Sequence, residues 1–118
     1  MAAQVKPNLE QGFGKSMETL VIPMPVYNIL TRLTGESRPD ISLSLAIKDL
    51  VRLRAEEARS KIAAFERKHG MDFAAFEQAR KAGKIPEAHS YAVEQDDWEW
   101  EAAVTDLATL EQVAEWLL

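Results

Sequence analysis

Residues 18–53 read ETLVIPMPVYNILTRLTGESRPDISLSLAIKDLVRL, and this stretch contains the elements that decide the fold. Its first residues alternate, so that Leu20, Ile22 and Met24 form one face of a short strand. Pro23 cannot donate a hydrogen bond within a sheet, which places the strand at an edge. A single short strand is stable only when it pairs with another, and the pattern offers no second strand. It therefore predicts a homodimer in which two copies pair this strand as an antiparallel ribbon.

Two helices are expected after this strand. Pro25 suits the first turn of a helix, and the apolar residues of 26–34 recur at helical spacing before Gly35 ends it. A second helix is expected over about 41–68, because no helix breaker occurs before Gly70. Such a helix is roughly 40 Å long, which is more than one small domain buries. Its length favours a dimer or a helix that projects toward a partner.

The remaining chain is also expected to be largely helical, so the predicted fold class is mainly α. A short helix lies within 71–84, with Asp72 as its N-cap and Gly83 as its stop. Residues 85–95 are interpreted as an extended linker because of their mixed polarity. A last helix is expected from residue 96 or 97 to Trp116, with acidic residues in its first turn.

The composition is that of one folded domain of ordinary size. The chain has 118 residues, of which 47% are hydrophobic and 28% charged, and it contains no cysteine. Disulfides, thiol nucleophiles and cysteine-based metal sites are therefore excluded. The sequence has no apolar run long enough to span a bilayer and no apolar signal segment, so a cytoplasmic protein without membrane contact is expected.

Charge divides the chain into regions. Residues 1–70 carry 11 basic and 8 acidic side chains, whereas residues 71–118 carry 3 and 11. Together with the expected helices and strand, this uneven distribution of charge predicts three regions. They are a mobile tail or leader over 1–16, a dimerisation domain over 17–69 and an acidic, helical partner-binding region over 70–118.

The strand followed by two helices resembles the ribbon-helix-helix family of small repressors and antitoxins. The residues that carry the resemblance are Leu20, Ile22, Met24, Pro25, the turn Gly35-Glu36-Ser37 and the helix from Ile41 to Leu53. The resemblance implies a dimer whose ribbon enters the major groove of operator DNA, with phosphates held at the start of the second helix. Carried over by position, it assigns DNA contacts to Thr19, Val21, Ser37, Arg38 and Ser42. Thr19 and Val21 are unusual groove readers, so a ribbon kept only for dimerisation is an open alternative.

The arrangement of segments along the whole chain is similar to that of prokaryotic antitoxins encoded beside small toxins. The similarity rests on the long second helix, the joint KHGMDFAAFEQARKAGKIP over 68–86 and the acidic WEWE pattern near the C-terminus. It implies an antitoxin that neutralises a basic toxin, of RNase type, and that also regulates its own promoter. The alternatives are a repressor of the same fold without a toxin partner and a helical dimeric scaffold protein.

The stretch EQDDWEWEAA, residues 94–103, is the main candidate for the partner-binding site. From Glu87 to Leu118 the chain has nine carboxylates and no lysine or arginine. In a helix Trp98 and Trp100 point about 200° apart, so one is expected in the core and the other on a second surface. The candidate contacts are Phe73, Phe76, Tyr91, Trp98 and Trp100 with Asp96, Asp97, Glu99 and Glu101. Two alternative explanations of the acidic stretch remain open: it is a solvated helix face, or it pairs with the chain's own basic long helix.

No enzyme is expected. His69 and His89 stand in no HxxxH or HExxH spacing, and the chain has no glycine-rich phosphate-binding motif. The acidic pairs have no nucleophile or histidine beside them in the sequence pattern. The sequence therefore predicts no catalytic residue, no metal and no cofactor.

Overall fold

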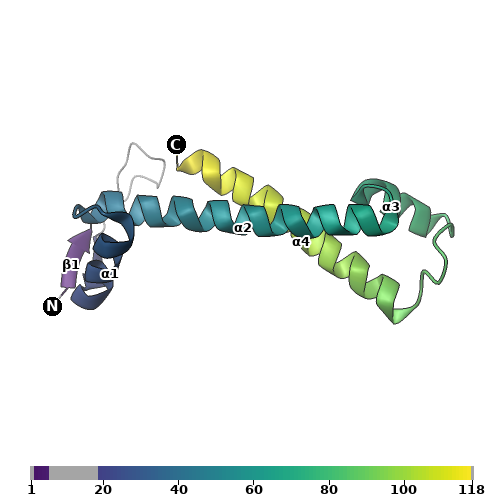
Figure 1. Cartoon of the computed structure of the whole chain (residues 1–118), viewed down its shortest axis with the longest axis horizontal. Helices are drawn as coiled ribbons and strands as arrows, with labels where there is room; N and C mark the ends of the chain where they lie inside the picture. The colour runs from purple at the N-terminus through teal and green to yellow at the C-terminus, as the bar shows by residue number, and fades with distance from the viewer. Residues whose placement is uncertain (1, 6–18, 118) are drawn as a thin grey trace. The chain divides into compact units, whose positions relative to one another are not determined.

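The computed structural model describes residues 2–5 and 19–117, with 2–5 described by their backbone alone. It shows the mainly helical protein that the sequence predicts (Figure 1). The chain divides into two compact units, Met1–Leu53 with Glu111–Leu118, and Arg54–Leu110. None of the helices in the described part of the chain has the length and apolar character needed to cross a membrane.

The first unit begins with a two-stranded antiparallel sheet. Strand β1 (Ala2–Val5) pairs with β2 (Leu20–Pro23), so that Ala3 lies opposite Ile22 and Val5 lies opposite Leu20. This corrects the expectation that the strand has no partner in its own chain, because residues from the segment expected to be a tail occupy one of its edges. The other residues of that segment lie outside the described part of the chain.

Helix α1 (Met24–Thr34) follows β2 directly, with Pro25 in its first turn as predicted. It ends where Gly35 adopts a left-handed conformation, with φ of 72°, and the Gly35 N–H donates to the carbonyl of Thr31. Only glycine takes this conformation without a steric penalty, so the residue type sets the end of the helix. The hydroxyl of Tyr27 donates to the carbonyl of Ser37 and ties α1 to the turn before the next helix.

Helix α2 (Pro39–His69) is 31 residues long and contributes its first half to the first unit and its second half to the second. Helix α3 (Phe73–Lys81) begins at Asp72, whose carboxylate accepts from the N–H of Ala75 at 2.8 Å, as the sequence predicts. The chain then turns back, and α4 (Tyr91–Trp116) runs along the second half of α2 within the second unit (Figure 1).

Helix α4 begins several residues earlier than the predicted 96 or 97. The hydroxyl of Ser90 accepts from the N–H of Val93, and the Ser90 carbonyl accepts from the N–H of Glu94. Ser90 is thus the N-cap, and part of the expected linker is helical. The aromatic Tyr91 therefore lies on the same helix as Trp98, which decides the geometry of the site below.

The core of the second unit is built at the seam between α2 and α4. On α2 the seam residues are Ala55, Ala58, Ile62, Phe65 and His69, three and four positions apart. Ala55, Ala58 and, on α4, Ala103 are buried, so the two helices meet through small side chains there. Phe76 of α3 and Trp100 of α4 are fully buried and fill the space at the other end of the seam.

Candidate functional site

The two tryptophans of the acidic stretch face different environments, as their spacing predicts. Trp100 is completely buried, whereas 66% of the Trp98 surface is exposed. An exposed tryptophan in a well-ordered helix is unusual, because this side chain gains more from burial than almost any other. Trp98 is therefore a surface feature that the fold of this unit does not explain.

Trp100 is enclosed by rings from α2 and α3. Its ring centroid lies 5.6 Å from Phe65, 5.3 Å from Phe73 and 5.1 Å from Phe76. The imidazole of His69 stacks on the indole at 5.5 Å and also lies 4.6 Å from Phe76. The indole Nε1–H finds no acceptor in this cluster. The cluster is thus held by packing and ring stacking rather than by a hydrogen bond from tryptophan.

The negative charge of Asp96 is balanced by side chains at the end of α2. Lys68 Nζ lies 2.6 Å from Asp96 Oδ2, and His69 Nε2 lies 3.0 Å from the same oxygen. Burial opposes a charge on Asp96, but the hydrogen bonds from Lys68 and His69 outweigh it and hold the pKa of Asp96 below its usual value. The chain's own basic helix therefore covers this carboxylate.

Asp97 has the opposite electrostatic environment. Burial, followed by the nearby carboxylate of Glu77, raises the pKa of Asp97 to about 6. A hydrogen bond with Asp97, followed by one from Arg80, lowers the pKa of Glu77, so the pKa values of the two neighbouring carboxyl groups move in opposite directions. Arg80 lies 3.1 Å from Glu77 and 3.8 Å from Asp97, and joins α3 to α4 at this point.

These contacts correct part of the predicted partner-binding set. Phe76 and Trp100 are core residues with no surface to offer, and Phe73 is half-buried against Trp100. Asp96 and Asp97 are also buried and are engaged by side chains of α2 and α3. The predicted residues that remain exposed are Tyr91, Trp98, Glu99 and Glu101.

The exposed residues form one continuous surface on α4. Tyr91, 80% exposed, is seven residues from Trp98, so both point to the same side of the helix, away from Trp100. Glu94 and Glu101, also seven residues apart, flank this side, and Glu99 borders its other edge with a hydrogen bond from Gln95 at 2.9 Å. We call Tyr91, Glu94, Trp98, Glu99 and Glu101 the outer stripe. Glu94 begins the candidate stretch 94–103 but was not among the individual contacts predicted from the sequence.

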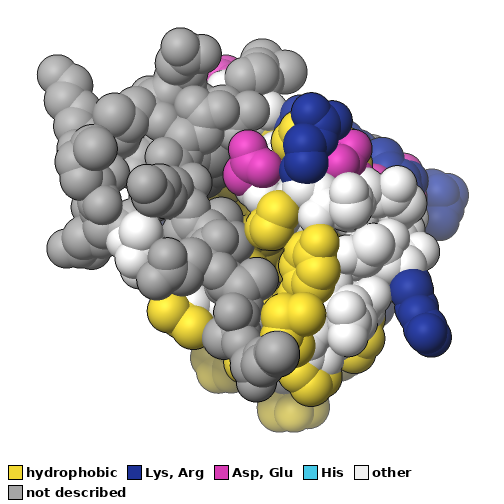
Figure 2. All heavy atoms as spheres, turned by 90° about the vertical axis from the view of Figure 1, so that its left-hand side faces the viewer, with side chains coloured by type: hydrophobic (Ala, Val, Ile, Leu, Met, Phe, Trp, Pro, Cys, Tyr) yellow, Lys and Arg dark blue, Asp and Glu magenta, His cyan; other side chains and the backbone are white. Residues whose placement is uncertain are grey.

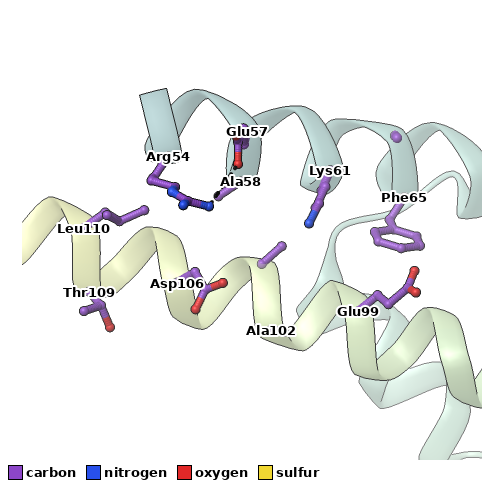
Figure 3. Close-up of a pocket in the computed structure, with 12 residues that line it drawn as sticks. Arg54, Glu57, Ala58, Lys61, Phe65, Glu99, Ala102, Asp106, Thr109 and Leu110 are labelled. Atoms are coloured by element: carbon purple, nitrogen blue, oxygen red, sulfur yellow. Dashed lines mark ion pairs between the residues drawn. The ribbon is translucent and has the colours of Figure 1, made fainter. Parts of the chain in front are cut away.

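A groove lies beside the outer stripe, between the second half of α2 and α4. Its volume is about 590 Å³. Figure 3 shows Lys61 pointing from α2 toward α4, and Phe65 and Leu110 near opposite ends of the groove. Sequence reasoning missed this feature, since it depends on the alanines of two distant segments coming together.

The predicted DNA contacts are not assembled into one basic surface. Ser42 is completely buried and donates to the carbonyl of Pro39 at 3.1 Å, which excludes it from contact with a phosphate. Arg38 donates from its guanidinium to both carboxylate oxygens of Glu36, at 2.9 and 3.1 Å, and its backbone N–H also donates to Glu36. The hydrogen bond with the Arg38 side chain lowers the pKa of Glu36 to about 2. Thr19, Val21 and Ser37 are exposed, and none of the three is charged.

The described residues contain no cluster of three or more His, Cys, Asp or Glu side chains that could hold a metal ion. The part of α4 from Tyr91 to Leu110 nevertheless combines exposed aromatic rings, flanking carboxylates and a neighbouring groove. Comparison with protein-family models, curated proteins and solved structures gives no match to this chain.

Proposed function

We propose that this protein is a homodimeric antitoxin-like inhibitor, which binds a basic partner protein of the toxin class through the outer stripe of α4. The observation that carries the proposal is the exposure of Trp98 and Tyr91 on a helix without a single lysine or arginine. Tryptophan and tyrosine are the residues most enriched among the anchors of protein interfaces. Carboxylates around them speed the encounter with a basic protein and select against acidic ones.

Arginine is the side chain that the outer stripe suits best. A guanidinium can stack on the face of Trp98 or Tyr91 and, at the same time, donate hydrogen bonds to a neighbouring carboxylate. Glu94, Glu99 and Glu101 supply such carboxylates within one or two turns of the rings. A basic nuclease, whose active surface carries arginine and lysine for nucleic acid, fits this chemistry. Occupying that surface would keep the substrate out.

The homodimer is supported by the apolar surface of the first unit. Val26, Ile29 and Leu33 share one face of α1, and they are 46%, 57% and 77% exposed. Leu20, Val21, Leu45, Ile47, Leu50 and Leu53 are exposed as well. Figure 2 shows hydrophobic side chains gathered together on the described part of this face. A monomer rarely leaves so many large aliphatic residues in water, so a second copy is the expected cover.

Binding to operator DNA is not part of the proposal. The one cationic side chain among the predicted DNA contacts, Arg38, is held by Glu36, and Ser42 is buried. No specific observation therefore favours a nucleic-acid role for the first unit.

Co-expression tests the proposal. The product of the neighbouring gene is expected to be a small basic protein that arrests growth, and the full chain is expected to restore growth. Trp98→Ala should abolish the rescue, because it removes the central ring, whereas Trp98→Phe should retain part of it. Full rescue by Trp98→Ala together with Tyr91→Ala, at equal protein levels, would refute the proposal.

A further inference from the structure

The residues that line the groove between α2 and α4 suit the binding of an α-helix. Six of its lining residues are apolar, namely Ala58, Ala64, Phe65, Ala102, Ala103 and Leu110. Four of these are alanines, so the floor is shallow and lets another backbone come close. The volume of about 590 Å³ is within the range of small-molecule pockets. Such pockets, however, have a few polar groups converging on the ligand, whereas here the charged groups stand along both rims.

The rim charges repeat with the period of a helix. On α2, Arg54 and Lys61 are seven residues apart, and on α4, Glu99 and Asp106 are also seven residues apart. Arg54 is paired with Glu57 at 3.8 Å, but both side chains are 63% exposed, so this ion pair is weak and can be exchanged. The α2 side of the groove therefore carries two basic residues, Arg54 and Lys61, with Glu57 between them, and the α4 side carries the acidic Glu99 and Asp106 (Figure 3).

We propose that this groove binds an amphipathic α-helix of the basic partner, with basic side chains seven residues apart beside Glu99 and Asp106. The apolar stripe of that helix packs on the two exposed alanines of the lining, Ala64 and Ala102, and its opposite flank presents acidic or neutral residues to Arg54 and Lys61. This inference rests on the proposed function and deepens it, because it names the element of the partner that is held beside the outer stripe. The packing is that of a three-helix bundle, in which two helices come from this chain and one from the partner.

A designed peptide provides the probe. The peptide is about three heptads long, with leucine at the a and d positions, lysine on one flank and glutamate on the other. Its control has the same composition in an order that destroys the apolar stripe. Fluorescence anisotropy of the labelled peptides with the full chain is expected to show binding of the amphipathic peptide and at least tenfold weaker binding of its control. Equal binding of the two peptides would overturn the proposal.

Two pairs of variants locate the binding. Ala102→Phe fills the groove from an exposed position, and Ala108→Phe places the same ring on an exposed position of α4 outside the lining. Glu99→Lys with Asp106→Lys reverses the acidic rim, whereas Asp49→Lys with Glu56→Lys makes the same charge change, at the same spacing, on exposed positions of α2 outside both the groove and the outer stripe. The first member of each pair should weaken peptide binding about tenfold or more, and the second should leave it within about twofold.

The remaining outcomes are also decisive. If Ala102→Phe and the rim reversal leave peptide binding unchanged, the groove is not the site. If sedimentation shows that the wild type forms assemblies larger than a dimer that Ala102→Phe dissolves, the occupant is a second copy and the proposal is wrong. Loss of partner binding in Trp98→Ala with intact partner binding in Ala102→Phe would remove the groove inference and leave the proposed function standing. Intact partner binding in Trp98→Ala with loss of partner binding in Ala102→Phe would refute binding through the outer stripe and support binding in the groove.

Discussion

At the scale of single residues, neighbours in the sequence have opposite environments. Trp98 and Trp100 are separated by one residue, yet one is a surface ring and the other is the centre of the core. Asp96 and Asp97 are adjacent, yet the pKa of Asp96 is lowered by Lys68 and His69 whereas the pKa of Asp97 is raised by burial and by Glu77. The acidic stretch is thus two surfaces of one helix, of which only the outer one is free for a partner.

The raised pKa of Asp97 predicts an unusual pH dependence of stability. Because the pKa of Asp97 is raised from 3.8 to about 6 in the folded protein, folding favours its protonated form. The stabilisation from this group is present below pH 3.8 and is lost as the pH rises through about 6. Asp97→Asn keeps a neutral group at this position. Relative to wild type it should therefore gain about 1 kcal/mol in free energy of unfolding between these two pH values, as measured by urea titration.

Glu77 has the opposite effect on the pH dependence of stability. Because its pKa is lowered in the folded protein, the stabilisation from Glu77 is lost only as the pH falls below its usual pKa of 4.5. Because Asp97 itself lowers the pKa of Glu77, the difference in stability between wild type and Asp97→Asn reports on the pair of carboxyl groups together. A difference that is constant across the range would show that Asp97 does not take up its proton on folding.

Trp100 combines good packing with an unsatisfied indole N–H. Trp100→Ala should lower the free energy of unfolding by about 3–5 kcal/mol, because it empties the centre of the ring cluster. Trp100→Phe should cost less than half as much, since it keeps a stacked ring and removes the unpaired donor. Urea unfolding of the two variants checks this, and similar losses for both would show that the N–H has a partner that stabilises it.

At the scale of elements, the helices with strong sequence signals were predicted closely. Pro25 and Gly35 define α1, and Asp72 begins α3, as expected from the residue types alone. The start of α4 and strand β1 were missed for identifiable reasons. Ser90 is an N-cap, but the mixed polarity of residues 85–95 suggested a linker. Strand β1 reads AAQV, and alanine is depleted in strands, so its residue types do not indicate a strand. The groove depends on contacts between α2 and α4, which no local pattern reports.

The two caps allow a matched comparison. Ser90→Ala removes the acceptor for the Val93 N–H, and Asp72→Ala removes the acceptor for the Ala75 N–H. Each should cost about 1 kcal/mol in thermal or urea unfolding, with the larger effect at Asp72, because its hydrogen bond is shorter and its carboxylate also suits the helix dipole. Ser90→Asp should retain the stability of wild type. No loss in Ser90→Ala would mean that α4 does not depend on this cap.

At the scale of the whole molecule, the two units have different surfaces and, in our account, different partners. The first exposes an aliphatic face on α1 and on the start of α2, which suits a second copy of the chain. The second exposes aromatic rings among carboxylates, which suits a basic protein. The residues that serve each surface could be assigned only from their burial.

Leu33→Glu tests the dimer. Leu33 is 77% exposed in the single chain, so a charge there should leave the fold intact while it disrupts packing against a second copy. Sedimentation equilibrium should show a monomer for Leu33→Glu, with unchanged helicity by circular dichroism, and a dimer for wild type. Asn28→Glu, at an exposed position on another side of α1, is the control and should remain a dimer. A wild-type monomer would contradict the proposed use of this face.

The most direct test of the account is sedimentation velocity of the full chain, with and without the basic product of the neighbouring gene. Wild type is expected to be a dimer that shifts to a larger complex when the partner is added. Trp98→Ala is expected to give the same dimer and no shift. A Trp98→Ala chain that still forms the larger complex would contradict the central claim that the outer stripe of α4 holds the partner.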